Sequence, residues 1–573
     1  MTAKNKVVLV FIFILLVFVV GVSAKPVKNV IVMIPDGMSQ GGVTLTRWYL
    51  GGKPLAMDNL ACGLVRTYSA DAVIADSAPA ATAMATGYKS HTGFISVLPE
   101  IAKMPGEKPI EPGQELRPVA TVLEAARLAG KATGLVVTCE VMHATPAAFA
   151  CHDPSRKNYD NLSEQEVYNG LDVVFGGGKM FFTKETRADK EDLIGQLGDM
   201  DYDVITTLEE LRQLKTPRVF GLFSPDYPDG ISYDIDRDKE KEPSLADMTS
   251  KAIELLEKDP DGFFLVVEGS KIDWAAHAND PVGLISEIAA FDRAVKVAVD
   301  FALANKNTVI LIMSDHGNGG ITLGASTTDK TYDTTVLDDY LKFLKKENIV
   351  TGTGLEKILL PIYRQVEVKF ALSNIIKYDG INKEFETEIR NKIEEYYGIK
   401  DLTQEEIDSI KFTLAYKANN GKLNAVIGPI ISKRSNLGWT TKGHTGEEVV
   451  LYAYSPNDDR PTGVLENTDI AKITANYLGV DLDAATQKLF VEAGSAFKVK
   501  GTVICTDKNP ADPVNPSLVV EKGGKRIRIP VNKNYAIIIE NGKETKIKLD
   551  GVAVYIEAKD RWYISRKAVD LLE

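Results

Sequence analysis

Four of the six histidines in this chain stand in short motifs that also carry carboxylates or hydroxyls at the spacing of metal ligands. Asp273 and His277 are four residues apart, so on a helix their side chains point to one side and can hold a single ion. The other motifs are Asp315-His316, His444-Thr-Gly and His143-Ala-Thr145. Imidazole and carboxylate with few thiols form the donor set of a catalytic zinc or zinc–magnesium site, whereas structural zinc sites favour cysteine. Each motif is common by itself, but their joint occurrence predicts a metalloenzyme.

A serine stands at the start of a predicted helix. Asp76 and Ser77 open an Ala-rich segment that ends at Gly87, which is the pattern of a helix with a capped N-terminus and a terminal glycine. Backbone N–H groups and the helix dipole favour an anion at that end. Most serines in this position only cap the helix, so the motif alone leaves both roles open for Ser77, cap and nucleophile.

Three candidate ligands, Asp36, Glu268 and Asp315, each follow an apolar run rich in valine and isoleucine. These runs predict buried strands, and helical patterns at 118–129 and 284–304 alternate with them. The order predicts a doubly wound α/β fold, with a largely parallel sheet flanked by helices and ligands bound at the carboxyl ends of the strands. The strand-like runs are residues 30–34, 135–137, 263–267 and 309–313.

The first 24 residues have the composition of a targeting segment. Lys4 and Lys6 precede a long apolar stretch, and small residues at 22–24 form the pattern that signal peptidase cuts. An uncleaved anchor helix is the alternative, although a spanning helix usually needs about 20 apolar residues. Either reading predicts an exported protein that is periplasmic, attached to the cell surface or extracellular.

The remaining chain divides into a domain at 25–500, a linker at 501–517 that is rich in Pro, Asn and Asp, and a β-rich appendage at 518–573. The appendage has Asn541-Gly542 where a hairpin turn belongs, and we interpret it as a stabilising or attachment domain. Within the large domain, the charged stretch 155–245 and the mostly helical stretch 322–438 are interpreted as insertions. They either cover the site or form oligomer contacts.

Net charge limits the partners. The whole chain carries −12, and without Lys4 and Lys6 it carries −14, which argues against nucleic acid or an anionic membrane as the main partner. An acidic protein that acts on anionic substrates needs local positive charge, which bound metal ions would supply. Cys139 and Cys151 flank the His143 motif, and the sequence leaves open whether they form a disulfide or stay free thiols.

The motifs resemble, in order, the motif series of the alkaline phosphatases across most of residues 28–480. None of them is specific alone, but the ordered set is. The matching motifs are Met-Ile-Pro-Asp36-Gly, Asp76-Ser77-Ala-Pro-Ala-Ala-Thr, His143-Ala-Thr145-Pro, Ser-Arg156-Lys, Glu268-Gly-Ser-Lys-Ile-Asp273-Trp274-Ala-Ala-His277, Asp315-His316 and Gly-His444-Thr-Gly.

The resemblance implies three metal sites. Asp273, His277 and His444 match the ligands of one zinc ion. Asp36, Asp315 and His316 match those of a second zinc, which Ser77 also reaches in the free enzyme. Asp36 then bridges to a third ion, usually magnesium, whose other ligands match Thr145 and Glu268.

The resemblance also implies the reaction. Ser77 would attack phosphorus and form a phosphoserine that water then hydrolyses, while Arg156 holds two phosphoryl oxygens and Asp76 orients Arg156. Two ions that clamp the attacking and leaving oxygens, and a planar guanidinium that suits phosphate, agree with this chemistry. We therefore expect a broad-specificity phosphomonoesterase that acts on small phosphate esters as a homodimer, with no membrane contact after signal cleavage unless it is attached to the cell surface.

Two positions vary within the family. In one bacterial branch an aspartate stands where this chain has His143, and a lysine where it has Trp274. The exchange is compatible with zinc or cobalt in place of magnesium at the third site. We expect His143 to act through neighbouring groups, with direct ligation as the alternative. A phosphodiesterase or sulfatase-like relative, and a non-catalytic phosphate-binding protein, are the competing functions, but Arg156, Ser77 and the complete third-site set favour the monoesterase.

Overall fold

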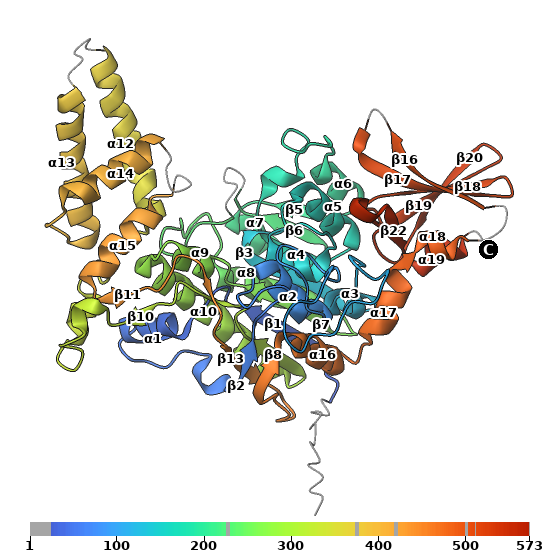
Figure 1. Ribbon diagram of the computed structural model, residues 1–573, viewed down its shortest axis with the longest axis horizontal. Coiled ribbons are helices and arrows are strands. Elements are labelled where there is room, and N and C mark those ends of the chain that lie inside the picture. The colour runs from blue at the N-terminus through green and yellow to red at the C-terminus, as the bar shows by residue number, and fades with distance from the viewer. Residues whose placement is uncertain are drawn as a thin grey trace, which may run out of the picture.

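A ten-stranded sheet forms the centre of the computed structural model, which describes residues 25–224, 230–372, 378–416, 422–498, 502–509 and 512–571 (Figure 1). Only β13 runs antiparallel to its neighbours, so the predicted largely parallel sheet flanked by helices is confirmed. Its strands, in spatial order, are β14 (Gly463–Glu466), β2 (Ala61–Arg66), β13 (Val449–Tyr454), β8 (Thr308–Ile312), β1 (Asn29–Ile34), β7 (Phe263–Glu268), β3 (Ala132–Glu140), β4 (Val173–Gly177), β6 (Val219–Leu222) and β5 (Asp203–Ile205).

The central strands are buried on both faces. Every residue of β1, β3, β7 and β8 is buried, which explains their continuous apolar sequences. Alternate residues enter two different cores: Ile31 and Met33 belong to one, whereas Val30 and Val32 belong to the other. The first core is covered by α1 (Gln40–Tyr49), α8 (Leu245–Leu256) and α10 (Pro281–Asn305), and the second by α2 (Ser77–Thr86), α3 (Val122–Leu128), α4 (Ala144–Ala150), α5 (Tyr159–Asn169) and α16 (Asn467–Leu478).

Residues 155–245 are interpreted from the sequence as an insertion, and the structure shows that this interpretation is wrong. They contain β4, β5 and β6, which extend the central sheet beyond β3 in parallel register. The strands are only three to five residues long, and charged loops and the short helices α6 (Leu193–Asp199) and α7 (Leu208–Gln213) separate them. Each strand therefore leaves only a short apolar run in the sequence, and these runs become strands by pairing in the order β3-β4-β6-β5.

Residues 322–438 are mostly helical, as expected, and carry the helices that project at one end of the molecule (Figure 1). Thr403 and Glu406 form a reciprocal cap before α14. Short strands β10 (Thr322–Leu323) and β11 (Leu437–Gly438) pair where this stretch leaves and re-enters the main domain. The helices are α11 (Leu337–Leu341), α12 (Gly352–Leu372), α13 (Tyr378–Tyr397), α14 (Gln404–Tyr416) and α15 (Asn424–Arg434).

A five-stranded antiparallel sheet stands at the opposite end (Figure 1). The predicted linker at 501–517 is wrong, because the described part of that stretch is strand: Cys505 pairs with Val519 and Thr506 with Leu518. Proline, asparagine and aspartate favour turns locally, but the ladder with β17 supplies backbone hydrogen bonds that outweigh this preference. The strands are β16 (Thr502–Asn509), β17 (Asp512–Lys522), β18 (Lys525–Pro530), β19 (Tyr535–Glu540) and β20 (Lys543–Lys548).

The hairpin turn predicted at Asn541-Gly542 is confirmed. It joins β19 to β20, and both residues have positive φ, +52° and +76°, as a two-residue type I′ turn requires. The predicted targeting segment, residues 1–24, lies outside the described residues. Among the helices that the structure describes, none combines the length and the apolar character needed to cross a membrane.

Candidate metal centre

The candidate ligands meet at one edge of the central sheet because β8, β1 and β7 are neighbours and run parallel. Asp36 follows β1, Glu268 ends β7, and Asp315-His316 follow β8. Since the carboxyl ends of these strands lie side by side, residues that are far apart in the sequence converge there.

Two further short elements complete the ring of ligands. Helix α9 (Lys271–His277) begins just after β7 and carries Asp273 and His277 one helical turn apart. Strand β12 (His444–Thr445) pairs with β9 (Gly317–Asn318), which places His444 beside His316. The rings of these two histidines stack with centroids 3.7 Å apart.

The first group consists of Asp273, His277 and His444. Nε2 of His277 lies 3.4 Å from Asp273 Oδ2 and 3.1 Å from Nε2 of His444, which in turn lies 3.6 Å from Asp273 Oδ1. Ligand atoms around a tetrahedral zinc ion at about 2.1 Å are separated by about 3.4 Å, so this group has the dimensions of a zinc site.

The opposite ring nitrogens fix the orientation of these histidines. Nδ1 of His277 lies 2.6 Å from the carbonyl of Lys442, and Nδ1 of His444 lies 2.8 Å from that of Ala75. A ring N–H that donates to a carbonyl leaves Nε2 as the nitrogen with a lone pair, which is the usual arrangement of a metal-binding histidine.

The second group surrounds His316, whose side chain is fully buried. Its Nε2 lies 3.2 Å from Asp315 Oδ2, 3.6 Å from Asp36 Oδ1 and 3.2 Å from the Oγ of Ser77. Ser77 is the first residue of α2, with Asp76 as the N-cap, so its hydroxyl also lies at a helix N-terminus. The predicted helix from Ser77 to Gly87 is confirmed, and Gly87 ends it in the left-handed conformation.

The third group is formed by Asp36, Thr145 and Glu268, all fully buried. Both carboxylate oxygens of Asp36, the Oγ1 of Thr145 and the Oε1 of Glu268 have no hydrogen-bond partner. Unpartnered buried oxygens are costly, and proteins usually pair them with a donor or a cation. This donor set therefore fits a divalent ion.

The charges of the site support the same conclusion. Burial, together with Asp315, Asp273 and Glu268, raises the pKa of Asp36 well above its usual range. Burial, reinforced by Asp315, raises the pKa of Glu268 to about 8. Buried carboxylates this close together cannot all stay ionised without positive charge among them. The residues present thus fit cations in all three groups.

Arg156 lies at the side of this centre on a network that also holds Asp76 and His143. Its Nη1 donates to Asp76 Oδ1, and its Nη2 lies 3.0 Å from His143 Nε2. Burial and the neighbouring guanidinium lower the pKa of His143 to about 3, so the imidazole is neutral and accepts the hydrogen bond from Arg156. The His143 ring makes an edge contact with Trp274, with centroids 6.0 Å apart.

The family model described as "Alkaline phosphatase" matches residues 27–480. The chain is 37% identical to alkaline phosphatase 3 of Bacillus subtilis over 466 residues, which is 78% of this chain and 88% of that protein. It is 35% identical to alkaline phosphatase 4 of the same organism, over 79% of this chain and 89% of that protein. The chain belongs to the alkaline phosphatase family. It is an enzyme that hydrolyses phosphate monoesters and depends on metal ions.

The solved structure of a cold-active alkaline phosphatase from Shewanella sp. has the same fold. Its TM-score is 0.63 at 28% identity, and the match covers 78% of this chain and 99% of that one. The family model ends at residue 480, so the five-stranded C-terminal sheet lies outside the residues that it matches.

Three residues of the site were not predicted from the sequence. Nδ2 of Asn318 donates to Asp273 Oδ1 at 2.5 Å and so orients that carboxylate. Ser270 accepts from the backbone N–H of Cys139, whose Sγ lies 3.5 Å from Glu268 Oε2. Asn318 stands two residues after His316, so proximity to a strand-end ligand was the available signal. The sequence did not indicate that Ser270 and Cys139 lie at the site, because their positions depend on the pairing of β3 with β7.

The sequence left open whether Cys139 and Cys151 form a disulfide, and in the structure the two thiols have separate partners. Cys139 and Cys151 are both free thiols, and the Sγ of Cys151 instead lies 3.3 Å from the carbonyl oxygen of Leu162. Of the remaining histidines, His152 is buried against Glu124 at 3.1 Å and has a structural role.

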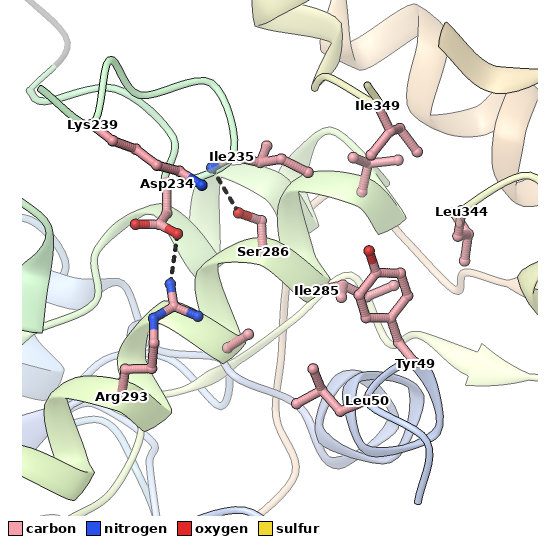
Figure 2. A pocket seen from close by; sticks show the side chains of 12 residues that line it. Tyr49, Leu50, Asp234, Ile235, Lys239, Ile285, Ser286, Arg293, Leu344 and Ile349 are labelled. Carbon is pink, nitrogen blue, oxygen red and sulfur yellow. Dashed lines mark hydrogen bonds and ion pairs between the residues drawn. The ribbon is translucent and has the colours of Figure 1, made fainter. Parts of the chain in front are cut away.

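A pocket lies between α1 and α10, away from the metal ligands (Figure 2). Two interactions cross this pocket: Arg293 donates to Asp234 at 2.6 Å, and Ser286 accepts from the backbone N–H of Ile235. None of the candidate ligands lines this pocket, so we assign it no part in the reaction.

Proposed function

We propose that this alkaline phosphatase cleaves phosphate monoesters of broad structure through a phosphoserine intermediate on Ser77. The observation that carries the proposal is the position of the Ser77 hydroxyl, buried at the N-terminus of α2 and 3.2 Å from Nε2 of His316 in a ring of buried carboxylates. A serine that only caps a helix has no need of such surroundings.

Each of the three groups of residues would hold one metal ion. One zinc would be held by Asp273, His277 and His444, and a second by Asp36, Asp315 and His316 with Ser77. A third ion, magnesium or in its place zinc or cobalt, would be held by Asp36, Thr145 and Glu268. When bound, such ions lower the pKa of a serine hydroxyl and of water and stabilise negative charge on attacking and leaving oxygens.

The protein's own groups bind and orient the ester. Arg156 presents two N–H groups to the phosphoryl oxygens, and Asp76 and His143 hold the guanidinium in place. The backbone N–H groups at the start of α2 face the same anion. His143 and Trp274 thus act beside the phosphate without contacting the reacting bond.

Two displacements at phosphorus complete the reaction. In the first, the Oγ of Ser77 loses its proton to solvent and bonds to phosphorus while the ester oxygen leaves and takes a proton from water. In the second, water bonds to phosphorus, the Ser77 oxygen leaves and regains a proton, and inorganic phosphate is released. Two inversions predict net retention of configuration at phosphorus.

The setting of the enzyme is also part of this proposal. Lys4, Lys6 and the apolar stretch after them support export through a signal peptide and a periplasmic, cell-surface or extracellular location. The resemblance to the family supports a homodimer. We assign catalysis to residues 25–500 and a stabilising or attachment role to the C-terminal sheet.

Hydrolysis of a simple aryl phosphate at alkaline pH tests the proposal. We expect turnover by the metal-replete enzyme, none after chelation, and none in the Ser77→Ala variant, while Ser409→Ala, at an exposed serine of α14, stays active. Acid quenching during turnover should yield a peptide with phosphate on Ser77, detected by mass spectrometry.

Other outcomes would redirect the assignment. Turnover of an aryl diester above that of the monoester would move this enzyme to a diesterase specificity. Binding of zinc and phosphate without turnover of either ester would leave a binding protein. Full activity of the Ser77→Ala variant would exclude Ser77 as the nucleophile.

A further inference from the structure

A thiol stands beside the third group of ligands. The Sγ of Cys139 and ligand atoms of His143 and Glu268 all lie within 4.8 Å of one another. Cys139 is the penultimate residue of β3 and is fully buried. No role was assigned to it by the motif series.

Cross-strand hydrogen bonds place this sulfur. The backbone N–H groups of Thr138 and Cys139 donate to the Oγ of Ser270 at 3.3 and 3.2 Å, and the N–H of Ser270 donates to the Oγ1 of Thr138 at 3.0 Å. The end of β3 is thereby tied to the turn that follows Glu268. These bonds fix the backbone at Cys139, whose Sγ lies 3.2 Å from the carbonyl oxygen of Glu140 and 3.5 Å from Glu268 Oε2.

The separation of the two ligand atoms matches one metal geometry. The Sγ of Cys139 lies 3.5 Å from Glu268 Oε2. With metal–sulfur and metal–oxygen bonds of about 2.3 and 2.1 Å, these atoms are about 3.6 Å apart around a tetrahedral ion and about 3.1 Å apart at adjacent octahedral positions. The observed distance therefore fits the tetrahedral preference of zinc better than the octahedral one of magnesium.

Independent polar atoms point to an ion at the same place. The Oγ1 of Thr145 and the Oε1 of Glu268 are buried without a partner, and both residues are fully buried. Nε2 of His143 accepts from Arg156, whereas Nδ1 of His143 has no partner and is the nitrogen that remains for ligation.

We propose that Cys139 is a ligand of the third ion, and that its sulfur, with His143 and Glu268, directs this site to zinc or cobalt rather than magnesium. The inference rests on the proposed function, because it concerns one of the three ions assigned there. Soft thiolate and imidazole donors suit zinc and cobalt, whereas magnesium takes oxygen ligands. As the sulfur–metal bond forms, the thiol proton passes to solvent.

Cobalt provides a test that does not depend on activity. Apoprotein reconstituted with cobalt should show thiolate-to-cobalt charge-transfer absorption in the near ultraviolet. The band should be retained in Cys151→Ser, which alters the other buried thiol, and lost in Cys139→Ser. After equilibration with zinc and magnesium together, elemental analysis should find zinc replaced by magnesium at one site per chain in Cys139→Ser only.

A second variant keeps the test decisive if Cys139→Ser does not fold. The triple variant C62S, C151S, C505S retains Cys139 as its single cysteine, and its cobalt form should show the full band. A cobalt-saturated wild-type enzyme without the band, or an unchanged band in folded Cys139→Ser, would overturn the inference. Aryl phosphate turnover by the same zinc-loaded wild-type sample separates this failure from failure of the proposed function, which that turnover would leave intact.

Discussion

Two clusters of acidic side chains in this molecule differ in what balances their charge. At the metal centre, Asp36, Glu268, Asp273 and Asp315 converge, and oxygens of Asp36, Glu268 and Asp315 are buried without a hydrogen-bond partner. In the second cluster, Glu164, Asp189 and Glu191 also bring ligand-type oxygens within 4.8 Å of one another. The separation of oxygens alone therefore does not distinguish the two.

The second cluster is balanced by the protein itself. The ammonium group of Lys533, from the C-terminal domain at 502–571, contacts Glu164 and lies 2.6 Å from Glu191 Oε2. Asn532 donates to the other oxygen of Glu164 at 2.8 Å, and Arg187 contacts Asp189. None of these three carboxylates has an unpartnered buried oxygen among the residues that the structure describes.

The comparison indicates that unpartnered oxygens, rather than the proximity of acidic side chains, distinguish the candidate metal centre. At the second cluster a lysine replaces the ion and fixes a domain to α5. The same docking surface includes Asn534, whose side chain contacts the carbonyl of Tyr168, and Asp550, whose carbonyl accepts from Arg127 at 2.5 Å. We therefore assign the first cluster to the proposed reaction and the second to docking of the C-terminal domain.

Removal of divalent ions should have the largest effect and should touch only one cluster. We expect chelation to lower kcat/KM for an aryl phosphate by at least about 10³-fold, because the proposed ions would stabilise charge on both reacting oxygens and each tenfold loss is about 1.4 kcal/mol. Limited proteolysis should find the C-terminal domain still docked. Release of that domain by chelator would show that the second cluster also holds an ion.

Loss of Lys533 should break the second cluster. Lys533→Met leaves Glu164 buried beside no cation, and we expect a loss of about 3–5 kcal/mol in unfolding free energy of the docked form. Denaturant unfolding measures it, with the exposed Lys543→Met as a control that should change stability by less than about 0.5 kcal/mol. Adding Glu164→Gln should recover part of the loss. An unaltered midpoint in Lys533→Met would refute the docking role.

The partly exposed Arg156 and the fully buried Arg187 should give opposite results. Arg156→Ala should lower kcat/KM by about 10–100-fold, the value of charge-assisted hydrogen bonds of about 1.5–3 kcal/mol, with little change in melting temperature. Arg187→Ala, which removes the partner of Asp189, should lower the melting temperature and leave kcat/KM of the folded enzyme unchanged. Equal kinetic losses in both variants would mean that the clusters are coupled.

Glu287 is a further buried carboxylate, balanced by a proton, and its effect should appear only as a dependence of stability on pH. Burial raises the pKa of Glu287 to about 8, and its carboxyl accepts from the backbone N–H of Asp234 at 2.6 Å. The folded state thus holds this proton where the unfolded state has lost it. Its contribution to stability is complete below about pH 4 and is lost as pH rises through about 8, with a slope of up to about 1.4 kcal/mol per pH unit.

Urea unfolding of the wild type and Glu287→Gln between pH 5 and 8 measures this contribution. The amide keeps the acceptor oxygen but carries no titrating proton, so the difference in stability between the two proteins should shift in favour of the variant as pH rises. A constant difference across that range would show that Glu287 is ionised in the folded enzyme.

Much of the fold and of the candidate site could be predicted because the relevant signals are local. Asp36, Glu268 and Asp315 each follow a continuous apolar run, and such runs become buried parallel strands whose ends must meet. The helix that begins at Ser77 and the turn at Asn541-Gly542 depend on caps and positive φ, which are properties of a few adjacent residues.

The sequence by itself thus determined the fold class, the family and the set of candidate ligands that converge. Only the tertiary structure decided that residues 155–245 extend the sheet, that 502–509 pair as a strand, that Cys139 lies against Glu268, and that Lys533 closes the second acidic cluster. These features depend on partners up to hundreds of residues away, and short, charged or turn-rich segments carry no local trace of them. A periodic apolar pattern indicates that a segment is buried, but it does not indicate which element packs against it.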